Sequence, residues 1–485
     1  MGSRAALRRV TMEPNPLLAY GDWLADTPDD WPREALGAAR RAFVDTLGVS
    51  IPGAAEPVTR RVLATVRGWG EGACTAFGAA ERLPAPWAAL ANGTAAHALD
   101  FDDNFDPAKA HASAVLVPAI LALAEQEDAP GRACLDAYIA GLQILGRVGQ
   151  GLNPYHRNRG WHATATVGAV GAAAACARLL GLDARQAACA LSISTSMAGG
   201  FMAQFGTMTK PIHAGLAAKA GVLAASLARA GIDAGMGALD GRTGMQRLMV
   251  GPDFEQLRDG LTHFEHGQTM RFETASVGEP LLILSSGLKV KRFPNCGSAH
   301  RAMDGLLALK DELGFTADDI AHIRVSAPVS HLNNLMYQRP ETGAQAKFSL
   351  EYGLAMIALR GQCTLADFDE GALADPAAVA LYPLIERNPV DKGEGEFPTR
   401  VEVTLNDGRT GDIAMKMPVG SIAAPLDEEQ FRAKFRQCAE GHVPGGIVAK
   451  MQDMLGRLES LPSIRPLMDL FRRQADEAHA MAQGQ

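Results

Sequence analysis

The amino-acid sequence predicts a mainly α-helical protein, with a large all-helical domain and a smaller inserted α+β domain. Apolar residues recur at helical spacing from Pro16 to about residue 284, and the pattern is helical again from Asp427. Strand-like alternation is confined to a block between them, and the length of 485 residues fits two or three domains. We predict a disordered leader at 1–15, a main domain at 16–284 completed by C-terminal helices within 421–480, and the smaller domain at 285–420.

The first part of the chain contains a series of Ala- and Leu-rich segments bounded by residues that start or stop helices. Gly53, Gly181 and Gly231 each follow such a segment, and Asp183 is placed to cap another. Strand-like alternation is nearly absent, which predicts a domain built of helices. The predicted helices lie at 35–49, 93–99, 115–127, 134–148, 162–180, 184–194 and 210–230.

The block at 285–420 carries the strand signals. Residues 322–327 alternate as HIRVSA, and residues 400–405 read RVEVTL. The second of these is followed by Asn-Asp-Gly and then DIAMKM, which predicts a β-hairpin because Asn-Gly and Asp-Gly steps suit tight hairpin turns. Helices are predicted at 300–313, 349–359 and 365–375.

The composition excludes several classes of function. The formal net charge is −8 and no long basic block occurs, so we expect no nucleic-acid partner. The seven cysteines include no C-x-x-C pair, which argues against a disulfide framework and against cysteine-bound zinc or iron–sulfur clusters, and fits a reducing cytoplasm. No glycine-rich nucleotide loop or G-x-S-x-G elbow is present.

Two segments bear on membranes and targeting. The apolar run at 163–177 is shorter than the ~20 residues that a membrane-spanning helix needs, so it predicts a buried helix and no membrane association. The N-terminal residues 1–12 carry three arginines and lack an apolar signal core. A disordered leader is the preferred interpretation, with an organelle-targeting segment as the alternative.

A polar cluster follows the predicted helix at 93–99. It contains His97, Asp100, Asp102 and Asp103 in close succession, and His111 follows a few residues later. One interpretation is a solvated acidic loop between two helices. The other is a general acid/base cluster, because such chemistry needs titratable groups next to a rigid helix end. The carboxylates lack the spacing and the glycine of a calcium loop, so we expect no metal.

Two further candidates stand at the starts of helices. His162 precedes a helix of small residues, where it is either a structural histidine or a pocket residue with a lowered pKa. Lys210 follows Thr209, a good N-cap, and a lysine at this end opposes the helix dipole. Lys210 is explained if it binds an anion together with the free N–H groups, and the alternative is an exposed loop lysine.

The segment KRFPNCGSAH combines two cations, a turn and a helix start, which suits a carboxylate ligand or else a solvated basic loop. Lys291 opens it and His300 closes it. Cys296 is a possible nucleophile, although the sequence specifies no adjacent base. Tyr352 is a possible proton donor, and the alternative is an ordinary amphipathic helix start.

These motifs, in this order, resemble the MmgE/PrpD family, which includes 2-methylcitrate dehydratase, cis-aconitate decarboxylase and iminodisuccinate epimerase. The resemblance implies a helical main domain, an α+β lid domain and a homodimer, with an active site between the domains that needs neither metal nor organic cofactor. The matching stretches are NGTAAHALDFDD followed by HAS, GWHATATVGAVGAAAA, GTMTKPIHAG, KRFPNCGSAH, KFSLEYGLA and RVEVTLNDG.

The resemblance also assigns residues. It implies that Asp100, His111, His162 and Lys210 are catalytic. The expected substrate-binding residues are Asn104, Lys291, Cys296, His300 and Tyr352. Two departures matter: Asn104 stands where Thr is common, and Cys296 stands where cis-aconitate decarboxylase has His, which counts against decarboxylation.

The function predicted from these features is a cofactor-independent lyase that dehydrates a small hydroxy di- or tricarboxylate resembling 2-methylcitrate. A base would remove a proton α to a carboxylate, and an acid would protonate the departing hydroxyl. The alternatives are an epimerase of an iminodisuccinate-like acid and a decarboxylase of a cis-aconitate-like acid. A non-catalytic helical scaffold is the alternative from another class, because a fold alone does not establish activity.

Overall fold

The structure, a computed structural model, describes residues 14–393, 395 and 397–472. The leader predicted at 1–15 lies almost wholly outside the described residues, as do residues 473–480 of the predicted C-terminal segment. The first part of the chain contains α1 (Pro16–Asp26), α2 (Arg33–Ala55), α3 (Pro57–Val66), β1 (Cys74–Thr75), β2 (Arg82–Leu83), α4 (Ala85–His97), α5 (Ser113–Glu127), α6 (Gly131–Leu152), α7 (Tyr155–Asn158), α8 (Ala163–Leu179), α9 (Ala184–Thr195), α10 (Thr209–Arg229), α11 (Met245–Val250), α12 (Phe254–Asp259) and α13 (Leu282–Ser285).

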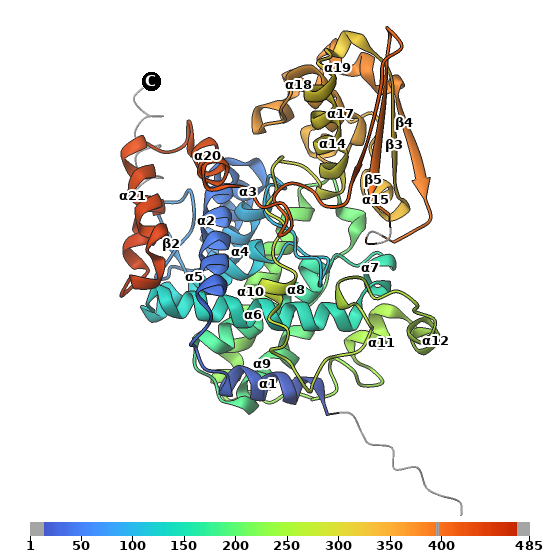
Figure 1. Cartoon of the computed structure of the whole chain (residues 1–485). Helices are drawn as coiled ribbons and strands as arrows, with labels where there is room; N and C mark the ends of the chain where they lie inside the picture. The colour runs from blue at the N-terminus through green and yellow to red at the C-terminus, as the bar shows by residue number, and fades with distance from the viewer. Residues whose placement is uncertain (1–13, 394, 396, 473–485) are drawn as a thin grey trace, which may run out of the picture.

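A second group of elements follows, and further helices close the described chain (Figure 1). The second group contains α14 (Gly297–Leu313), β3 (Ile320–Pro328), α15 (Val329–Asn334), α16 (Gly343–Ala346), α17 (Leu350–Arg360), α18 (Glu370–Leu373), α19 (Pro376–Leu381), β4 (Ile385–Val390), β5 (Thr399–Leu405) and β6 (Thr410–Met415). Helices α20 (Glu428–Ala439) and α21 (Gly445–Gly456) come next, and residues 465–472 are also helical.

The larger core is a set of closely packed helices. Helix α10 packs against α4, α8 and α9, and α8 also packs against α6. Small residues permit this approach: a Cβ on Gly93 of α4 would lie 2.8 Å from the Cα of Gly215 in α10, and one on Gly221 would lie 2.3 Å from Ala172 in α8. Such contacts are closer than side chains allow, so the abundance of Gly and Ala has a direct structural use.

Helix α10 is the one helix among the described residues that is long and apolar enough to cross a membrane by length and composition. It is largely buried against other helices of the protein, as the core helix of a globular domain is.

The second core combines a sheet with helices. Its four strands have the order β4-β3-β5-β6, with β3 and β4 parallel and the other pairs antiparallel. Helix α14 packs on β5 and β6, and α17 packs on α14. The predicted hairpin is confirmed as β5 and β6, whose turn is closed by the Leu405 N–H donating to the Arg409 carbonyl. Gly408 adopts a φ of +87° in this turn, which glycine tolerates at no steric cost.

Three details of the secondary-structure prediction are wrong. Strand β4 has the sequence IERNPV, whose charges and Pro389 do not suggest a strand, and it is tolerated because β4 is an edge strand. The helix predicted at 365–375 is a 3-10 turn followed by the four-residue α18. Residues 233–281 form mostly irregular chain with two six-residue helices, since turn-forming glycines and aspartates interrupt the pattern there.

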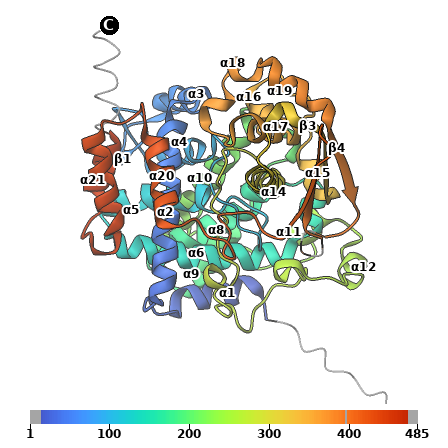
Figure 2. The same cartoon turned by 45° about the horizontal axis from the view of Figure 1, so that its top comes forward.

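The last helices return to the first core. Helix α20 packs along α2, and Phe435, Met451 and Phe471 belong to the larger hydrophobic core. A buried ion pair reinforces this contact, with Lys434 Nζ 2.7 Å from Asp45 Oδ1. In Figures 1 and 2, the pair α20 and α21 and the second group of elements lie on different sides of the helical core. The larger core is therefore built from residues that precede the second group in the sequence and from residues that follow it.

Candidate active site

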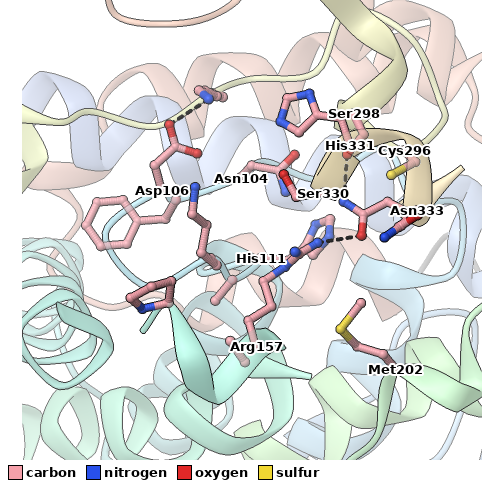
Figure 3. A pocket seen from close by; sticks show the side chains of 18 of the residues that line it. Asn104, Asp106, His111, Arg157, Met202, Cys296, Ser298, Ser330, His331 and Asn333 are labelled. Atoms are coloured by element: carbon pink, nitrogen blue, oxygen red, sulfur yellow. Dashed lines mark hydrogen bonds and ion pairs between the residues drawn. The ribbon is translucent and has the colours of Figure 1, made fainter. Parts of the chain in front are cut away.

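A cavity of about 730 Å³ lies where the two cores meet. One wall comes from the helical core, through the loop between α4 and α5 and the starts of α8 and α10. The other wall comes from the second group, through the start of α14 and through α15. Figure 3 shows His111 and Arg157 on the first wall, with Cys296, Ser298 and His331 opposite them. The cavity is large enough for a small organic acid together with water.

The turn after α4 holds the most strongly charged part of the cavity. Asp100 has a φ of +53°, a left-handed conformation that Asp adopts more readily than most residues. Its Oδ1 lies 2.6 Å from Lys210 Nζ and 3.1 Å from Lys291 Nζ. Lys291 also donates to the Asp100 carbonyl at 2.6 Å. All three residues are buried, so this is a carboxylate with two ammonium groups in a low-dielectric site.

The next carboxylate, Asp102, binds two imidazoles. Its Oδ2 lies 2.8 Å from His97 Nδ1 and 3.2 Å from His111 Nδ1. This leaves His111 Nε2 on the side of Asp100, at 3.8 Å from Asp100 Oδ1. Asp102 therefore orients His111, whose ring lines the cavity.

Asp103 points the other way, into the helical core. It accepts hydrogen bonds from the N–H and the hydroxyl of Ser113, the first residue of α5, and that hydroxyl also lies 2.6 Å from the Tyr138 hydroxyl. Burial raises the pKa of Asp103 to about 7. Because Asp100, Asp102 and Asp103 are all buried, the interpretation as a solvated acidic loop is wrong.

His162 precedes the first turn of α8 and faces the cavity. Its Nδ1 lies 3.0 Å from Nδ1 of His213, while its buried Nε2 has no hydrogen-bond partner among the described residues. Its ring stacks on His97 at a centroid distance of 6.0 Å and meets the edge of Phe205 at 5.0 Å. A nitrogen with an unused lone pair or proton thus borders the cavity.

The environment sets the charge of these groups. Burial raises the pKa of Asp100, but the ammonium groups of Lys210 and Lys291 outweigh burial and hold that pKa below its usual range. Asp102 behaves in the same way, since His97 and His111 outweigh the burial that raises its pKa. Burial lowers the pKa of His111, and burial together with Lys210 lowers the pKa of His162 well below its usual value. Ionised carboxylates and neutral imidazoles are the expected forms at neutral pH.

Four of these side chains also bring possible metal-ligand atoms within 4.8 Å of one another. The ammonium groups of Lys210 and Lys291 contact one of the carboxylates, and this positive charge opposes a further cation. The arrangement therefore suits an anionic ligand better than a metal ion. The four residues are His97, Asp100, Asp102 and His111.

The structure brings eight of the nine predicted site residues to this cavity. Cys296 immediately precedes α14 and is half-buried, and His300, one turn later, is buried with its Nε2 lacking a hydrogen-bond partner among the described residues. The eight are Asp100, Asn104, His111, His162, Lys210, Lys291, Cys296 and His300.

Two expectations need correction. Tyr352 does not line the cavity: it is packed in the second core, where its hydroxyl donates to the Asp367 carbonyl. Its ring contacts Phe368, and α17 is buried on every side from 350 to 358, so Tyr352 is a core residue of a buried helix. Lys210 is the second residue of α10, which starts at Thr209 instead of being capped by it, and its ammonium binds Asp100 directly.

Several residues of the site escaped prediction. His97 and Asp102 belong to the predicted acid/base cluster but were given no individual roles, and His213 was not singled out, although it lies three residues after Lys210, a spacing that puts side chains on one helix face. Farther out, Lys289 Nζ lies 2.6 Å from Asp106, and Arg157 donates to Asn334, which in turn donates to Ser298. Their partners are distant in sequence, so no local pattern identifies them.

Comparison with known proteins agrees with this architecture. Residues 21–257 match the MmgE/PrpD N-terminal domain, and residues 293–458 match the MmgE/PrpD C-terminal domain. A cis-aconitate decarboxylase-like protein of Aspergillus oryzae is 26% identical over 490 residues, covering 95% of this chain and 98% of the relative.

Other relatives carry the name cis-aconitate decarboxylase, among them a fungal and a mouse protein. The protein of Aspergillus terreus is 28% identical over 473 residues, with 91% of this chain and 93% of the relative covered. The protein of Mus musculus is 27% identical over 463 residues, with 92% and 91% covered. Both domains are matched in order and across most of the chain, so the resemblance seen in the motifs is confirmed, and the chain belongs to the MmgE/PrpD family.

Proposed function

We propose that this protein is a lyase acting on a small polycarboxylate, and that its first reaction to test is decarboxylation of a cis-aconitate-like acid. The observation that carries the proposal is the buried group formed by Asp100, Lys210 and Lys291 beside His111 and His162. This group of three has a charge of +1, which the ionised Asp102 beside it offsets, so Lys210 and Lys291 supply local, preorganised positive charge at the wall of the cavity. Such a preorganised charge binds a carboxylate and stabilises the extra negative charge of an aci-carboxylate.

The relatives support decarboxylation as the particular reaction. In that reaction the bond between carbon and one carboxylate breaks, carbon dioxide leaves, and the electron pair spreads over the remaining unsaturated acid before carbon takes a proton. Lys210 and Lys291 would stabilise the charge, and a protonated imidazole would supply the proton. The bound substrate's own negative charges favour that protonated form, because nearby anions raise an imidazole pKa.

Cys296 bears on this assignment, because cis-aconitate decarboxylase carries a histidine at that position. Here His300, one turn later on α14, brings an imidazole to the same wall, and its Nε2 has no hydrogen-bond partner among the described residues. We propose that His300 contacts a substrate carboxylate or the reacting carbon from that side. The loss of a histidine at position 296 therefore does not remove imidazole chemistry from this wall.

Dehydration of a hydroxy polycarboxylate is the second candidate, and a specific observation favours it. His162 lines the cavity as a neutral imidazole whose Nε2 has no hydrogen-bond partner among the described residues, which suits a general base. It would remove the proton α to a carboxylate, while His111, oriented by Asp102, would assist the departing hydroxyl. In either reaction we propose that the second group of elements acts as a lid, since α14 and α15 form one wall.

The proposal is tested by incubating the purified, chelator-treated protein in D₂O with separate acids and following proton NMR. The panel contains cis-aconitate, 2-methylcitrate, citrate and aspartate-derived dicarboxylates. A new methylene signal with loss of carbon dioxide from cis-aconitate supports decarboxylation, and a new vinylic signal from a hydroxy acid supports dehydration. Loss of an α-proton signal without a change of skeleton identifies an epimerase instead.

Two controls give these outcomes a clear meaning. Lys210→Met is expected to turn over every acid far more slowly than the wild type, since it removes half of the cationic pair. Thermal stabilisation by these acids without turnover would contradict a lyase and favour the non-catalytic scaffold, because ligand binding alone raises the melting temperature.

A further inference from the structure

His213 contacts His162 from outside the cavity lining. It belongs to the first turn of α10 and is buried, and its ring centroid is 5.2 Å from that of His162. His162 lines the cavity, whereas His213 is not among the described residues that line it. The contact between their Nδ1 atoms, at 3.0 Å, needs one N–H and one lone pair. Only one of the two Nδ1 atoms therefore carries a proton.

We infer that His213 is a positioning residue: it accepts a hydrogen bond from Nδ1–H of His162 and so holds the Nε2 lone pair of His162 toward the cavity. The inference rests on the proposed function, in which His162 exchanges a proton with the substrate. The hydrogen bond made by one ring nitrogen fixes the state of the other. His213 would thus decide which tautomer of His162 the substrate meets.

The opposite arrangement does not allow proton exchange. If His213 donated, His162 would carry its proton on Nε2 and would have no lone pair for the substrate there. Giving up that proton would leave an anionic imidazolate in a buried site, which is strongly unfavourable. In the inferred arrangement Nε2 takes a proton and later returns it, while Nδ1–H keeps its partner throughout. The assignment therefore serves both candidate reactions.

The groups around the pair are consistent with two neutral rings. Lys210 lies on the same helix as His213, and His97 and His111 approach His162 from α4 and from the loop before α5. Burial lowers the pKa of His213, and Lys210 lowers it further. The anions Asp100 and Asp102 are already engaged by lysines and imidazoles. A neutral His213 remains free to accept at Nδ1 when His162 becomes protonated.

The space around His213 is also restricted. A Cβ on Gly200 would lie 3.2 Å from Nδ1 of the His213 ring and 2.6 Å from Ala165 Cβ, and the Gly200 carbonyl accepts from the His162 N–H. Gly200 therefore holds the backbone of His162 through its carbonyl, and its lack of a side chain leaves room for the His213 ring.

The first test is nitrogen NMR on the full-length protein labelled with ¹⁵N-histidine, without any substrate. The signals of His162 are assigned as those lost in His162→Gln. We expect a protonated Nδ1 and an unprotonated Nε2 at neutral pH. A protonated Nε2 in the wild-type protein would overturn the inference whatever the substrate proves to be, so this result does not depend on the proposed function.

The second test compares variants at position 213. His213→Leu removes the acceptor, and we expect a mixture of His162 tautomers and a kcat at least about 10-fold lower with KM nearly unchanged. His213→Asn places an amide oxygen near the original Nδ1, and we expect it to restore the Nδ1–H tautomer and most of kcat. His322→Leu, on strand β3, is the matched control.

The outcomes separate the two proposals. Unchanged kcat and an unchanged His162 tautomer in a folded His213→Leu would refute the positioning role. The expected tautomer with no turnover of any acid would leave the positioning role standing and contradict the lyase. If His213→Leu does not fold, the wild-type tautomer and the His213→Asn variant still decide the question.

Discussion

Two buried aspartates of this protein form ion pairs with lysines, but one has a single lysine partner and the other has two. Asp45 on α2 pairs with Lys434 at 2.7 Å, and Asp100 in the cavity pairs with Lys210 at 2.6 Å. Asp100 has Lys291 as a second partner, at 3.1 Å. Burial raises the pKa of Asp45 despite Lys434, whereas the two lysines outweigh burial and lower the pKa of Asp100.

The difference separates a structural charge pair from a binding site. The Asp45–Lys434 pair has no net charge, and it joins α20 to the helical core. The Asp100 group places two ammonium groups on one carboxylate in a cavity wall, where a substrate carboxylate can contact them. Removing one lysine from each should therefore affect different properties.

The largest effect on stability is expected for Lys434→Met. The variant leaves Asp45 buried without its partner, and we expect a loss of about 3–5 kcal/mol in the free energy of unfolding. Part of the loss should return in the double variant with Asp45→Asn, which leaves no charge behind. Chemical denaturation measures both. Arg432→Met, which breaks an exposed pair with Glu428, is the control, and equal stabilities of the Lys434 and Arg432 variants would contradict the structural role.

Lys210→Met should affect activity instead. Lys291 still neutralises Asp100, so the fold should tolerate the change, while kcat/KM falls by roughly 10²–10³-fold because a group that stabilises the transition state is lost. Steady-state kinetics with the best acid of the panel measures the effect. Lys219→Met lies on the same helix near Trp87 and should leave kcat/KM unchanged. Near-normal turnover in Lys210→Met would disprove the role of this ammonium group in stabilising the transition state.

Stability should also depend on pH through the buried neutral histidines. Burial lowers the pKa of His97, of His156 and of His300 to about 3. Between their ordinary value near 6.5 and about 3, the unfolded chain binds these protons and the folded chain does not. Stability should therefore fall as the pH falls through this window, by about 1.4 kcal/mol per pH unit for each group.

Denaturation at several pH values from 7 to 4.5 measures this slope. His156, whose Nε2 lies 2.9 Å from the Thr166 hydroxyl, is outside the cavity lining, so His156→Asn should reduce the slope by one group without removing a proposed catalytic residue. A slope equal to that of the wild type would show that His156 is not a neutral buried base in the folded protein.

The smallest effect is expected at the half-buried thiol. Cys296→Ser keeps the size and polarity of the side chain, and because no covalent role is proposed, kcat/KM should fall by less than about 10-fold. Complete loss of activity in a folded variant would instead favour a nucleophilic cysteine, which mass spectrometry of the protein with its substrate would detect as an adduct.

Most of the cavity residues could be predicted from the sequence because they lie next to residues that start or stop helices. Asp100, His162 and Lys210 lie at helix ends, and their residue types are unusual there. Tyr352 was misplaced because its partners, Phe368 and the Asp367 carbonyl, lie on a separate turn, and the helix pattern alone does not say which groups its side chain meets. The motif predicted the helix correctly but not its orientation.

The remaining errors concern partners that are far apart in sequence. Lys434 and Asp45 are separated by most of the chain, and no local pattern around either residue predicts that the two form an ion pair. Lys210 was expected to hold an anion with helix N–H groups, whereas its first partner is the protein's own Asp100. The position and type of the lysine were informative, but its charge balance depended on the tertiary structure.

The return of α20 and α21 to the helical core has a consequence for how the protein forms during synthesis. The ribosome completes the strands β3 to β6 and their helices before it releases the residues around Phe435, Met451 and Phe471 that finish the larger core. Domains generally fold as units while the chain emerges. The second group can therefore fold first, and the larger core must wait until these later residues have been made. A nascent chain stopped before α20 would expose the surface of α2 that this helix covers, and would be a natural target for chaperones.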